Sequence, residues 1–390
     1  MVSGWVVTAS ANDWPQWRGL GRDGISTETV NAAWPDSGPT MLWRAAVGVG
    51  FSSVAVSHSR ACTMGNTNGQ DTIWCFDAKT GKGLWQHSYP AALDPQYYEG
   101  GPGATPTIAG GRVFTLSKWG DVFCLDAATG AVLWQRDLRE AGLKPNRWGF
   151  AGSPLVWEDL VLLNAGAAGI ALDSRTGRVA WSSGTNAAGY ASPVLTKSGT
   201  NPVVLIFAAK HLVAVDPRTG HELWRFPWET KWDTNNSDPL VHPKGIFISS
   251  FTRGCALVAV QNSEAKRVYQ ANSLSNHLSP GILLGDFLYA FNGEAKFKTD
   301  LRCIHLPSGE PKWAAKDPAF GSLISAGGKL ILLSEKGELC LAEASGLGFQ
   351  PLIRANVLPG VCWTPPALAD GLLYVRNAQG ELRCLDLRLK

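Results

Sequence analysis

Residues 75–85 read Cys-Phe-Asp-Ala-Lys-Thr-Gly-Lys-Gly-Leu-Trp, and this pattern returns along the chain. Its common form is Asp-x-x-Thr-Gly-x-x-x-Trp. A weaker copy replaces Asp by His305 and ends at Trp313, and the last copy stops at Asp386. The four full copies carry their Asp, Gly and Trp at Asp77, Gly81 and Trp85; Asp126, Gly130 and Trp134; Asp173, Gly177 and Trp181; and Asp216, Gly220 and Trp224.

The spacing of these copies predicts eight units. Successive Asp positions lie 49, 47 and 43 residues apart, and the two later gaps, 89 and 81 residues, each span two periods. We therefore place two further units at 256–269 and 340–346. Repeats of about 40–50 residues with several short strands are typical of β-propellers. The fold class predicted is all-β, an eight-bladed β-propeller of four-stranded antiparallel sheets.

Within each unit, four strands named A to D follow one another. A Ser/Thr-Pro pair such as Thr105-Pro106 opens strand A, since proline is tolerated at a strand's first residue. Strand C is expected to end at the Asp and strand D at the Trp. The Asp-x-x-Thr-Gly segment is a C–D turn in which Gly supplies positive φ, and the Trp packs on the next unit. Residues 41–43, Met-Leu-Trp, resemble the end of a strand D and are predicted to close the ring by completing the last sheet.

Composition excludes several classes of protein. Of 390 residues, 45% are apolar, and 35 Lys and Arg against 32 Asp and Glu give a net charge of +3. Like charges form no run, which excludes a basic nucleic-acid-binding tail. No stretch of 18 apolar residues is long enough for a membrane-spanning helix. The domain prediction is one propeller over 37–390, preceded by an extension over 12–36, and we expect a monomer.

The N-terminus resembles an export signal whose charged beginning is missing. Residues 2–8 are mostly apolar, and Ala9-Ser10-Ala11 has the small-x-small form of a signal-peptidase site, but the first positive charge is Arg18. The sequence therefore predicts a truncated signal segment over 1–11 and a periplasmic or otherwise exported protein. An ordinary cytoplasmic N-terminus is the alternative.

Taken together, these motifs resemble the pyrroloquinoline-quinone (PQQ) repeat family. The opening Trp14-Pro15-Gln16-Trp17-Arg18-Gly19 is similar to the start of its short, secreted members. The family includes quinoprotein dehydrogenases and BamB-like relatives that carry no cofactor. Its cofactor-using members imply PQQ with Ca²⁺, often beside a vicinal Cys-Cys disulfide. This sequence has no Cys-Cys pair and no Cys-x-x-Cys-His haem motif. The resemblance therefore favours a non-catalytic branch, and neither a cofactor nor a metal site is assigned.

The eight cysteines fall into two groups, those at a fixed position of the repeat and those outside it. Five of them occupy the same position in their repeats, two residues before the Asp position. Equivalent positions in neighbouring units lie too far apart for a disulfide. We therefore expect these five to be small buried side chains without a disulfide. They are Cys75, Cys124, Cys303, Cys340 and Cys384. Cys62, Cys255 and Cys362 lie outside the pattern, and the sequence leaves their pairing open.

Candidate ligand-binding residues lie on the D–A and B–C connections. D–A connections range from about nine to about twenty residues, whereas the C–D turns are nearly uniform, and loops on a rigid scaffold concentrate binding residues. Aromatic, basic and amide side chains there suit a polar or anionic ligand, a sugar or an extended peptide. Packing of the loops is the alternative role. The candidates are Lys118, Arg147, Trp148, Tyr190, Asn236, Asp238, Arg253, His277 and Trp363.

These observations give one leading function and two alternatives. The leading prediction is a non-enzymatic, exported binding or scaffold protein for a protein, peptide or saccharide. The first alternative is a PQQ-dependent quinoprotein oxidoreductase of the alcohol or sugar dehydrogenase type. The second is a purely structural module of a cell-envelope assembly. His277 and Asp238, at neighbouring blade openings, are the one pair that could act as acid and base.

Overall fold

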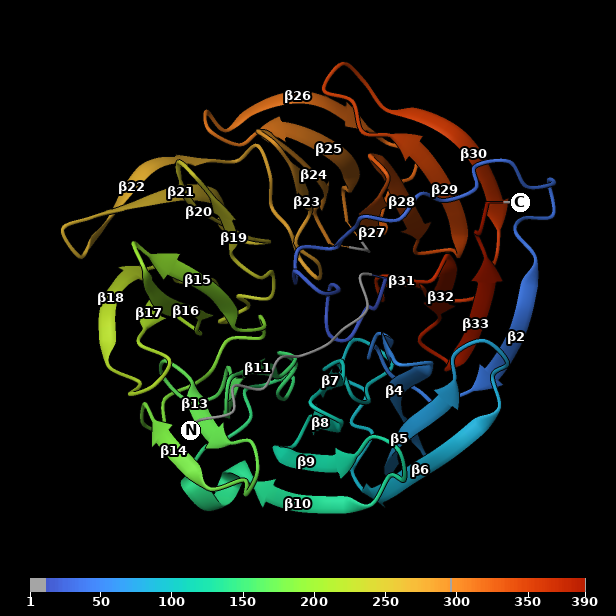
Figure 1. Cartoon of the computed structure of the whole chain (residues 1–390). Coiled ribbons are helices and arrows are strands. Elements are labelled where there is room, and N and C mark those ends of the chain that lie inside the picture. The colour runs from blue at the N-terminus through green and yellow to red at the C-terminus, as the bar shows by residue number, and fades with distance from the viewer. Residues whose placement is uncertain (1–11, 295–296, 390) are drawn as a thin grey trace. The chain divides into compact units, whose positions relative to one another are not determined.

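The structure is a computed structural model that describes residues 12–294 and 297–389. The predicted signal segment, residues 1–11, lies outside the described residues. The described residues form eight sheets, each built on four antiparallel strands, numbered here 1 to 8 in chain order (Figure 1). This confirms the predicted all-β, eight-bladed β-propeller, including the two units placed in the doubled gaps, which are sheets 5 and 7.

The strands are short, and each sheet keeps the order A-B-C-D. Sheets 1 and 2 consist of β3 (Ala55–Ser57), β4 (Arg60–Thr67), β5 (Gln70–Asp77) and β6 (Gly83–Pro90), and of β7 (Thr107–Ala109), β8 (Arg112–Leu116), β9 (Asp121–Asp126) and β10 (Val132–Asp137). Sheets 3 and 4 consist of β11 (Leu155–Trp157), β12 (Leu160–Leu163), β13 (Ile170–Asp173) and β14 (Val179–Ser182), and of β15 (Val194–Ser198), β16 (Asn201–Phe207), β17 (His211–Val215) and β18 (Glu222–Pro227).

The second half of the chain repeats this order. Sheets 5 and 6 consist of β19 (Leu240–His242), β20 (Gly245–Ser250), β21 (Gly254–Gln261) and β22 (Glu264–Ala271), and of β23 (Ile282–Leu284), β24 (Phe287–Asn292), β25 (Asp300–His305) and β26 (Glu310–Ala315). Sheets 7 and 8 consist of β27 (Gly321–Ala326), β28 (Lys329–Ser334), β29 (Glu338–Glu343) and β30 (Gln350–Asn356), and of β31 (Ala367–Ala369), β32 (Leu372–Arg376), β33 (Glu381–Asp386) and β2 (Met41–Ala46).

The described residues divide into two compact units. The first holds residues 109–280 and 306–310, and the second holds 12–108, 281–294, 297–305 and 311–389. Each unit has its own buried apolar clusters, formed by the alternating inward residues of its strands.

Strand β2 completes sheet 8, as predicted. It pairs antiparallel with β33 with Trp43 opposite Cys384, and Figure 1 shows the N-terminal strand beside the C-terminal one. The last sheet therefore takes its outer strand from the beginning of the chain, which removes an unpaired edge.

The C–D turns are stabilised by the side chains of the repeat. In sheet 2, Asp126 Oδ1 accepts hydrogen bonds from Thr129 N at 2.8 Å and from Thr129 Oγ1 at 2.9 Å, and Gly130 has φ 74°. The turns of sheets 1, 3 and 4 repeat these bonds. Short polar side chains that bond nearby backbone favour such turns.

The repeat tryptophans bond to the next sheet. Trp134 Nε1 donates to Ser174 O at 3.0 Å, and Trp181 Nε1 donates to Pro217 O at 2.9 Å. The sequence places the end of strand D at this Trp, but the structure differs. Trp134 is the third residue of β10, which continues to Asp137 because its backbone goes on pairing with β9.

Residues 12–36, which belong to the second unit, contact other strands of that unit. Trp14 bonds Val56 of β3 through both backbone groups, and β1 (Ile25–Ser26) pairs in parallel with β27. Arg18 is buried and donates to Asp23 O and Gly281 O at 2.6 and 2.9 Å. The described residues contain one short 3₁₀ helix, Leu138–Ala141, so none of their helices has the length and hydropathy of a bilayer span.

Candidate functional site

Eight of the nine predicted binding residues lie on loops of the first unit, and Trp363 lies in the second. The loops are the B–C and D–A connections of sheets 2 to 5. One of these connections, residues 228–239, joins β18 to β19 and brings Asn236 and Asp238 to one end of sheet 5. Residues 251–253 join β20 to β21 at that same end of sheet 5.

Asn235 fixes the 228–239 loop in place. This side chain is 0% exposed, and its Nδ2 donates to Ala208 O at 2.8 Å and to Trp228 O at 3.1 Å. Its Oδ1 accepts from Ser250 Oγ at 2.9 Å. A fully satisfied buried amide rigidifies the structure around it. The loop is therefore attached to sheets 4 and 5 by side-chain bonds and is a rigid support for its neighbours.

Asp238 takes a position that serine or threonine holds in other sheets. Its Oδ1 accepts from Ser192 N at 2.7 Å, just as Ser192 Oγ accepts from Ser153 N and Thr105 Oγ1 accepts from Ser53 N, both at 3.0 Å. Asp238 is 6% exposed. The carboxylate thus belongs to a row of hydrogen bonds that joins the first residues of neighbouring sheets.

Four cations of the first unit stack on tryptophans at these loops. Arg147 Cζ lies 5.1 Å from the ring centre of Trp148, and Lys231 Nζ lies 4.6 Å from that of Trp232. The other two pairs are Lys118 with Trp119 at 5.4 Å and Arg253 with Trp228 at 4.7 Å. Such stacking attracts the cation to the ring face and orients it.

The Trp148 ring contacts a buried tyrosine and an exposed arginine, Tyr190 and Arg147. Tyr190 is buried, its ring centre lies 5.9 Å from that of Trp148, and its hydroxyl accepts from Trp148 N at 3.3 Å. Lys118 is also buried, whereas Arg147 is exposed. Lys231 and Trp228 are not among the residues predicted from the sequence. A basic residue directly before Trp occurs on the B–C and D–A connections at 118, 147 and 231, and this pattern is the signal that would have found Lys231.

Several buried polar atoms at the loop end of sheet 5 have no hydrogen-bond partner within the described residues. We call these residues the sheet 5 loop cluster. Each such atom costs roughly 1–3 kcal/mol when no partner is supplied, and in native proteins they call for a specific explanation. The atoms are Thr234 Oγ1, Asn236 Oδ1, Ser237 Oγ, Arg253 Nε and His277 Nδ1.

His277 belongs to this cluster and packs against an aromatic ring. Its ring centre lies 5.4 Å from that of Phe251, and burial lowers the pKa of His277 to about 4. The imidazole is therefore neutral near pH 7. Asp238 accepts a hydrogen bond from Ser192 N, and His277 packs against Phe251. Their joint action as an acid/base pair stays a prediction.

This burial gives a testable pH dependence. The unfolded chain binds a proton at His277 near its ordinary pKa of 6.5 and the folded chain only near 4. Stability from this residue is complete above pH 6.5 and is lost as pH falls toward 4. Between pH 7.5 and 5, urea unfolding should show about 2 kcal/mol more destabilisation in wild type than in His277→Gln. Equal losses in the two proteins would contradict the assignment.

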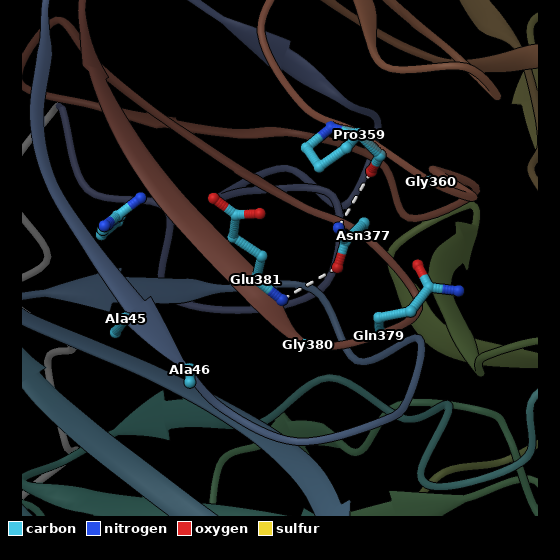
Figure 2. Close-up of a pocket in the computed structure, with 9 residues that line it drawn as sticks. Ala45, Ala46, Pro359, Gly360, Asn377, Gln379, Gly380 and Glu381 are labelled. Carbon is cyan, nitrogen blue, oxygen red and sulfur yellow. Dashed lines mark hydrogen bonds between the residues drawn. The ribbon is translucent and has the colours of Figure 1, made fainter.

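Trp363 lies in the second unit and stacks on Phe51, with ring centres 5.4 Å apart and planes 22° apart. A separate surface pocket of about 630 Å³ in that unit is lined by Arg44, Pro359, Asn377 and Glu381 among others (Figure 2). Asn377 Nδ2 donates to Pro359 O at 2.9 Å, and Glu381 Oε1 accepts from Arg383 Nε at 2.8 Å. None of the nine predicted binding residues lines this pocket.

Comparison with known proteins identifies the family. A family model described as outer membrane protein assembly factor BamB matches residues 69–315. The chain belongs to this family. The match agrees with the PQQ-like repeat that the sequence motifs indicated. No curated protein matches the sequence.

Solved structures share the fold at low sequence identity. BamB from Moraxella catarrhalis is 17% identical, with 90% of this chain and 98% of that chain covered and a TM-score of 0.65. A quinohemoprotein alcohol dehydrogenase from Comamonas testosteroni is 14% identical, with 98% and 82% covered and a TM-score of 0.67. A computationally designed protein, Ika8, is 13% identical, with 90% and 100% covered and a TM-score of 0.60. At these identities the likeness extends to the fold alone.

Because one of the similar structures is a quinohemoprotein, we asked whether the side chains of this chain could hold a quinone with Ca²⁺. Calcium needs several oxygen ligands, usually with carboxylates among them. Among the residues 12–294 and 297–389, no three His, Cys, Asp or Glu side chains gather closely enough to hold a metal ion. The described residues do not fit the calcium ion, and we derive no step through either group.

Proposed function

We propose that this chain is an exported binding protein whose B–C and D–A loops hold an acidic, extended segment of a partner protein. The observation that carries the proposal is the set of four Lys–Trp and Arg–Trp stacks at the loops of the first unit. In two of them, Arg147–Trp148 and Lys231–Trp232, the cation is exposed, so a positive charge lies beside an aromatic surface, which suits carboxylates on a polypeptide. Lys118 and Trp228, in the other two stacks, are buried.

The Arg–Trp stacks are the most selective part of this arrangement. A stacked guanidinium can present its planar edge of N–H donors to a carboxylate, and a stacked side chain loses less rotational freedom on binding. Arg253 Nη1 donates to Glu229 O at 2.7 Å, while its buried Nε has no partner within the described residues. Trp232 is 43% exposed, so its ring is accessible to a ligand.

Two further observations support a protein partner. The family model is described as an assembly factor for outer membrane proteins, and a factor of that kind acts on other polypeptides. The Ala9-Ser10-Ala11 motif supports export, which fractionation of the cells that make this protein would test. Recovery of the protein only from the cytosol would contradict export.

We predict that the stacked cations determine binding of acidic peptides. The probe is a fluorescein-labelled peptide that alternates Glu and Ser, measured by fluorescence anisotropy against one that alternates Gln and Ser. The acidic peptide should bind more tightly, and less so at high salt. The double variant Arg147→Ala, Lys231→Ala should weaken it about tenfold, which is about 1.4 kcal/mol.

Arg218→Ala is the matched control for this experiment. Arg218 Cζ lies 4.9 Å from the ring centre of Trp157, but it belongs to the C–D turn of sheet 4 and not to the predicted binding loops. This variant should bind like wild type. Equal binding of the two peptides, or an equal loss in Arg218→Ala, would contradict the proposal. Binding of an alginate oligosaccharide without binding of the acidic peptide would replace it with the saccharide alternative.

A further inference from the structure

Two cysteines face each other in sheet 1. Cys62 of β4 and Cys75 of β5 are direct partners in the antiparallel register, and both are 0% exposed. Their thiols are within hydrogen-bonding contact of each other. Direct partners of an antiparallel pair point to the same face of a sheet. The two sulfur atoms therefore share one position in the core of sheet 1.

The register shows which kind of pair this is. Direct partners alternate between hydrogen-bonded pairs and non-hydrogen-bonded pairs, and the latter bring Cα atoms to about 4.5 Å. Asn66 exchanges both its backbone bonds with Val49, on the side away from β5, so Asn66 and its partner Asp71 form a non-hydrogen-bonded pair. Cys62 lies four residues before Asn66 and has the same parity. The Cys62–Cys75 pair is therefore of the close kind, within the Cα range that a disulfide bridges.

The other seven sheets place no second thiol at this position. There an aromatic residue or a leucine lies opposite a cysteine, an alanine or a leucine. The equivalent pairs are Phe114 with Cys124, Leu162 with Ala171, Leu205 with Ala214, Phe247 with Leu257, Tyr289 with Cys303, Leu332 with Cys340, and Tyr374 with Cys384. Sheet 1 thus differs from the others by one residue, Cys62, which stands where a large side chain is otherwise found.

We propose that Cys62 and Cys75 form a cross-strand disulfide when the chain folds in the presence of a disulfide-bearing oxidant. The thiolate of one cysteine attacks the oxidant's disulfide and releases the first thiol. The other cysteine then displaces the second thiol from the mixed disulfide. Two protein thiols lose two protons and two electrons, and the oxidant leaves as two thiols. This inference does not depend on the proposed binding function.

The reaction belongs to folding and not to the folded state. The Cys75 thiol and burial raise the pKa of Cys62 well above its ordinary value, and only the thiolate attacks a disulfide. Oxidation must then precede burial of the two side chains. Once formed, the bond is shielded from reductants, as expected of a structural disulfide in an oxidising compartment.

The disulfide would stabilise the part of the second unit where the two ends of the chain meet. Strand β4 follows β3, whose Val56 bonds Trp14 of the N-terminal extension. Thr63 and Met64, beside Cys62, accept hydrogen bonds from Arg376 of sheet 8 at 3.2 and 2.7 Å. A covalent link between β4 and β5 would hold this junction in register.

The experiment refolds reduced, urea-denatured protein in a mixture of oxidised and reduced glutathione, or in excess reductant. Free thiols are then blocked with N-ethylmaleimide under denaturing conditions. The two cysteines share the tryptic peptide 61–79, between Arg60 and Lys79. After oxidative refolding this peptide should be two hydrogen atoms lighter and unmodified, and after refolding in reductant it should carry two maleimides.

Single substitutions provide the controls. In Cys62→Ser the peptide should carry one maleimide under both conditions. In Cys384→Ser, which alters the same position of sheet 8 opposite Tyr374, the disulfide should form as in wild type. Oxidised wild type should also melt at a higher temperature than reduced wild type, a difference that Cys62→Ser abolishes. Eight blocked thiols in natively folded, oxidatively refolded protein would overturn the proposal, as would a link from Cys62 to another cysteine.

Discussion

Substitution of Arg376 by alanine should destabilise the protein by about 4 kcal/mol or more. Arg376 ends strand β32 and is 1% exposed. Its Nη1 donates to Ser52 O at 3.0 Å and to Met64 O at 2.7 Å, and its Nη2 donates to Gly48 O at 3.0 Å. Backbone carbonyls from the segment between β2 and β3, and from β4, thus surround the cation.

The large effect follows from what the substitution leaves behind. A buried charge is tolerated only when its donors are satisfied, and here the guanidinium donates hydrogen bonds to carbonyl and hydroxyl oxygens. Alanine removes those donors at once and leaves at least three buried carbonyls without them, as well as a cavity. Arg376→Lys keeps the charge but not the planar fork, so it should lose about half as much.

The midpoint of urea unfolding, followed by tryptophan fluorescence, measures these losses. Arg383→Ala is the control, because Arg383 lies on the neighbouring strand β33 but is part-exposed, pairs with Glu381 and donates to one backbone carbonyl, Val357 O at 2.7 Å. Surface pairs of this kind contribute about 0–1 kcal/mol. A loss in Arg376→Ala no larger than that in Arg383→Ala would contradict the role of Arg376. If Arg376→Ala does not fold, the loss of stability in Arg376→Lys is compared with that in Arg383→Ala instead.

The sequence predicted the number of sheets because turn chemistry is local. Asp126, Thr129 and Gly130 make their bonds within five residues, so the pattern survives in the sequence wherever the turn does. Sheet 5 shows the limit of this approach. Its C–D turn uses Asn262 and Ser263, both at positive φ, and has no Asp-x-x-Thr-Gly motif. The doubled spacing, with the apolar run 256–260 inside it, indicated that sheet.

The candidate site was less predictable because its contacts cross from one sheet to another. Asp238 is a candidate from the sequence, but its bond to Ser192 N forms only because sheet 4 lies beside sheet 5. Arg376 gave no signal, since its acceptors are backbone atoms far away in sequence. Cys62 was left without a partner because the antiparallel register, and not the repeat, pairs it with Cys75.

The second large effect is expected in Gly220→Ala, which should destabilise the protein by about 3 kcal/mol. Gly220 ends the C–D turn of sheet 4 with φ +70°, and a Cβ there would lie 2.5 Å from two ring atoms of Trp181. The ring cannot easily retreat, because Trp181 Nε1 donates to Pro217 O of the same turn at 2.9 Å. Alanine therefore adds a steric clash to the cost of its left-handed backbone.

A comparison with Gly111→Ala separates these two costs. Gly111 has φ +73°, and a Cβ added there would meet no atom within 4 Å. Its substitution should cost only the backbone term, about 1 kcal/mol. In the Trp181→Ala background, Gly220→Ala should fall to that same value, because the clash has been removed. Equal urea midpoints for Gly220→Ala and Gly111→Ala in the wild-type background would show that Trp181 does not constrain the turn, and the repeat would then require its glycine for backbone conformation alone.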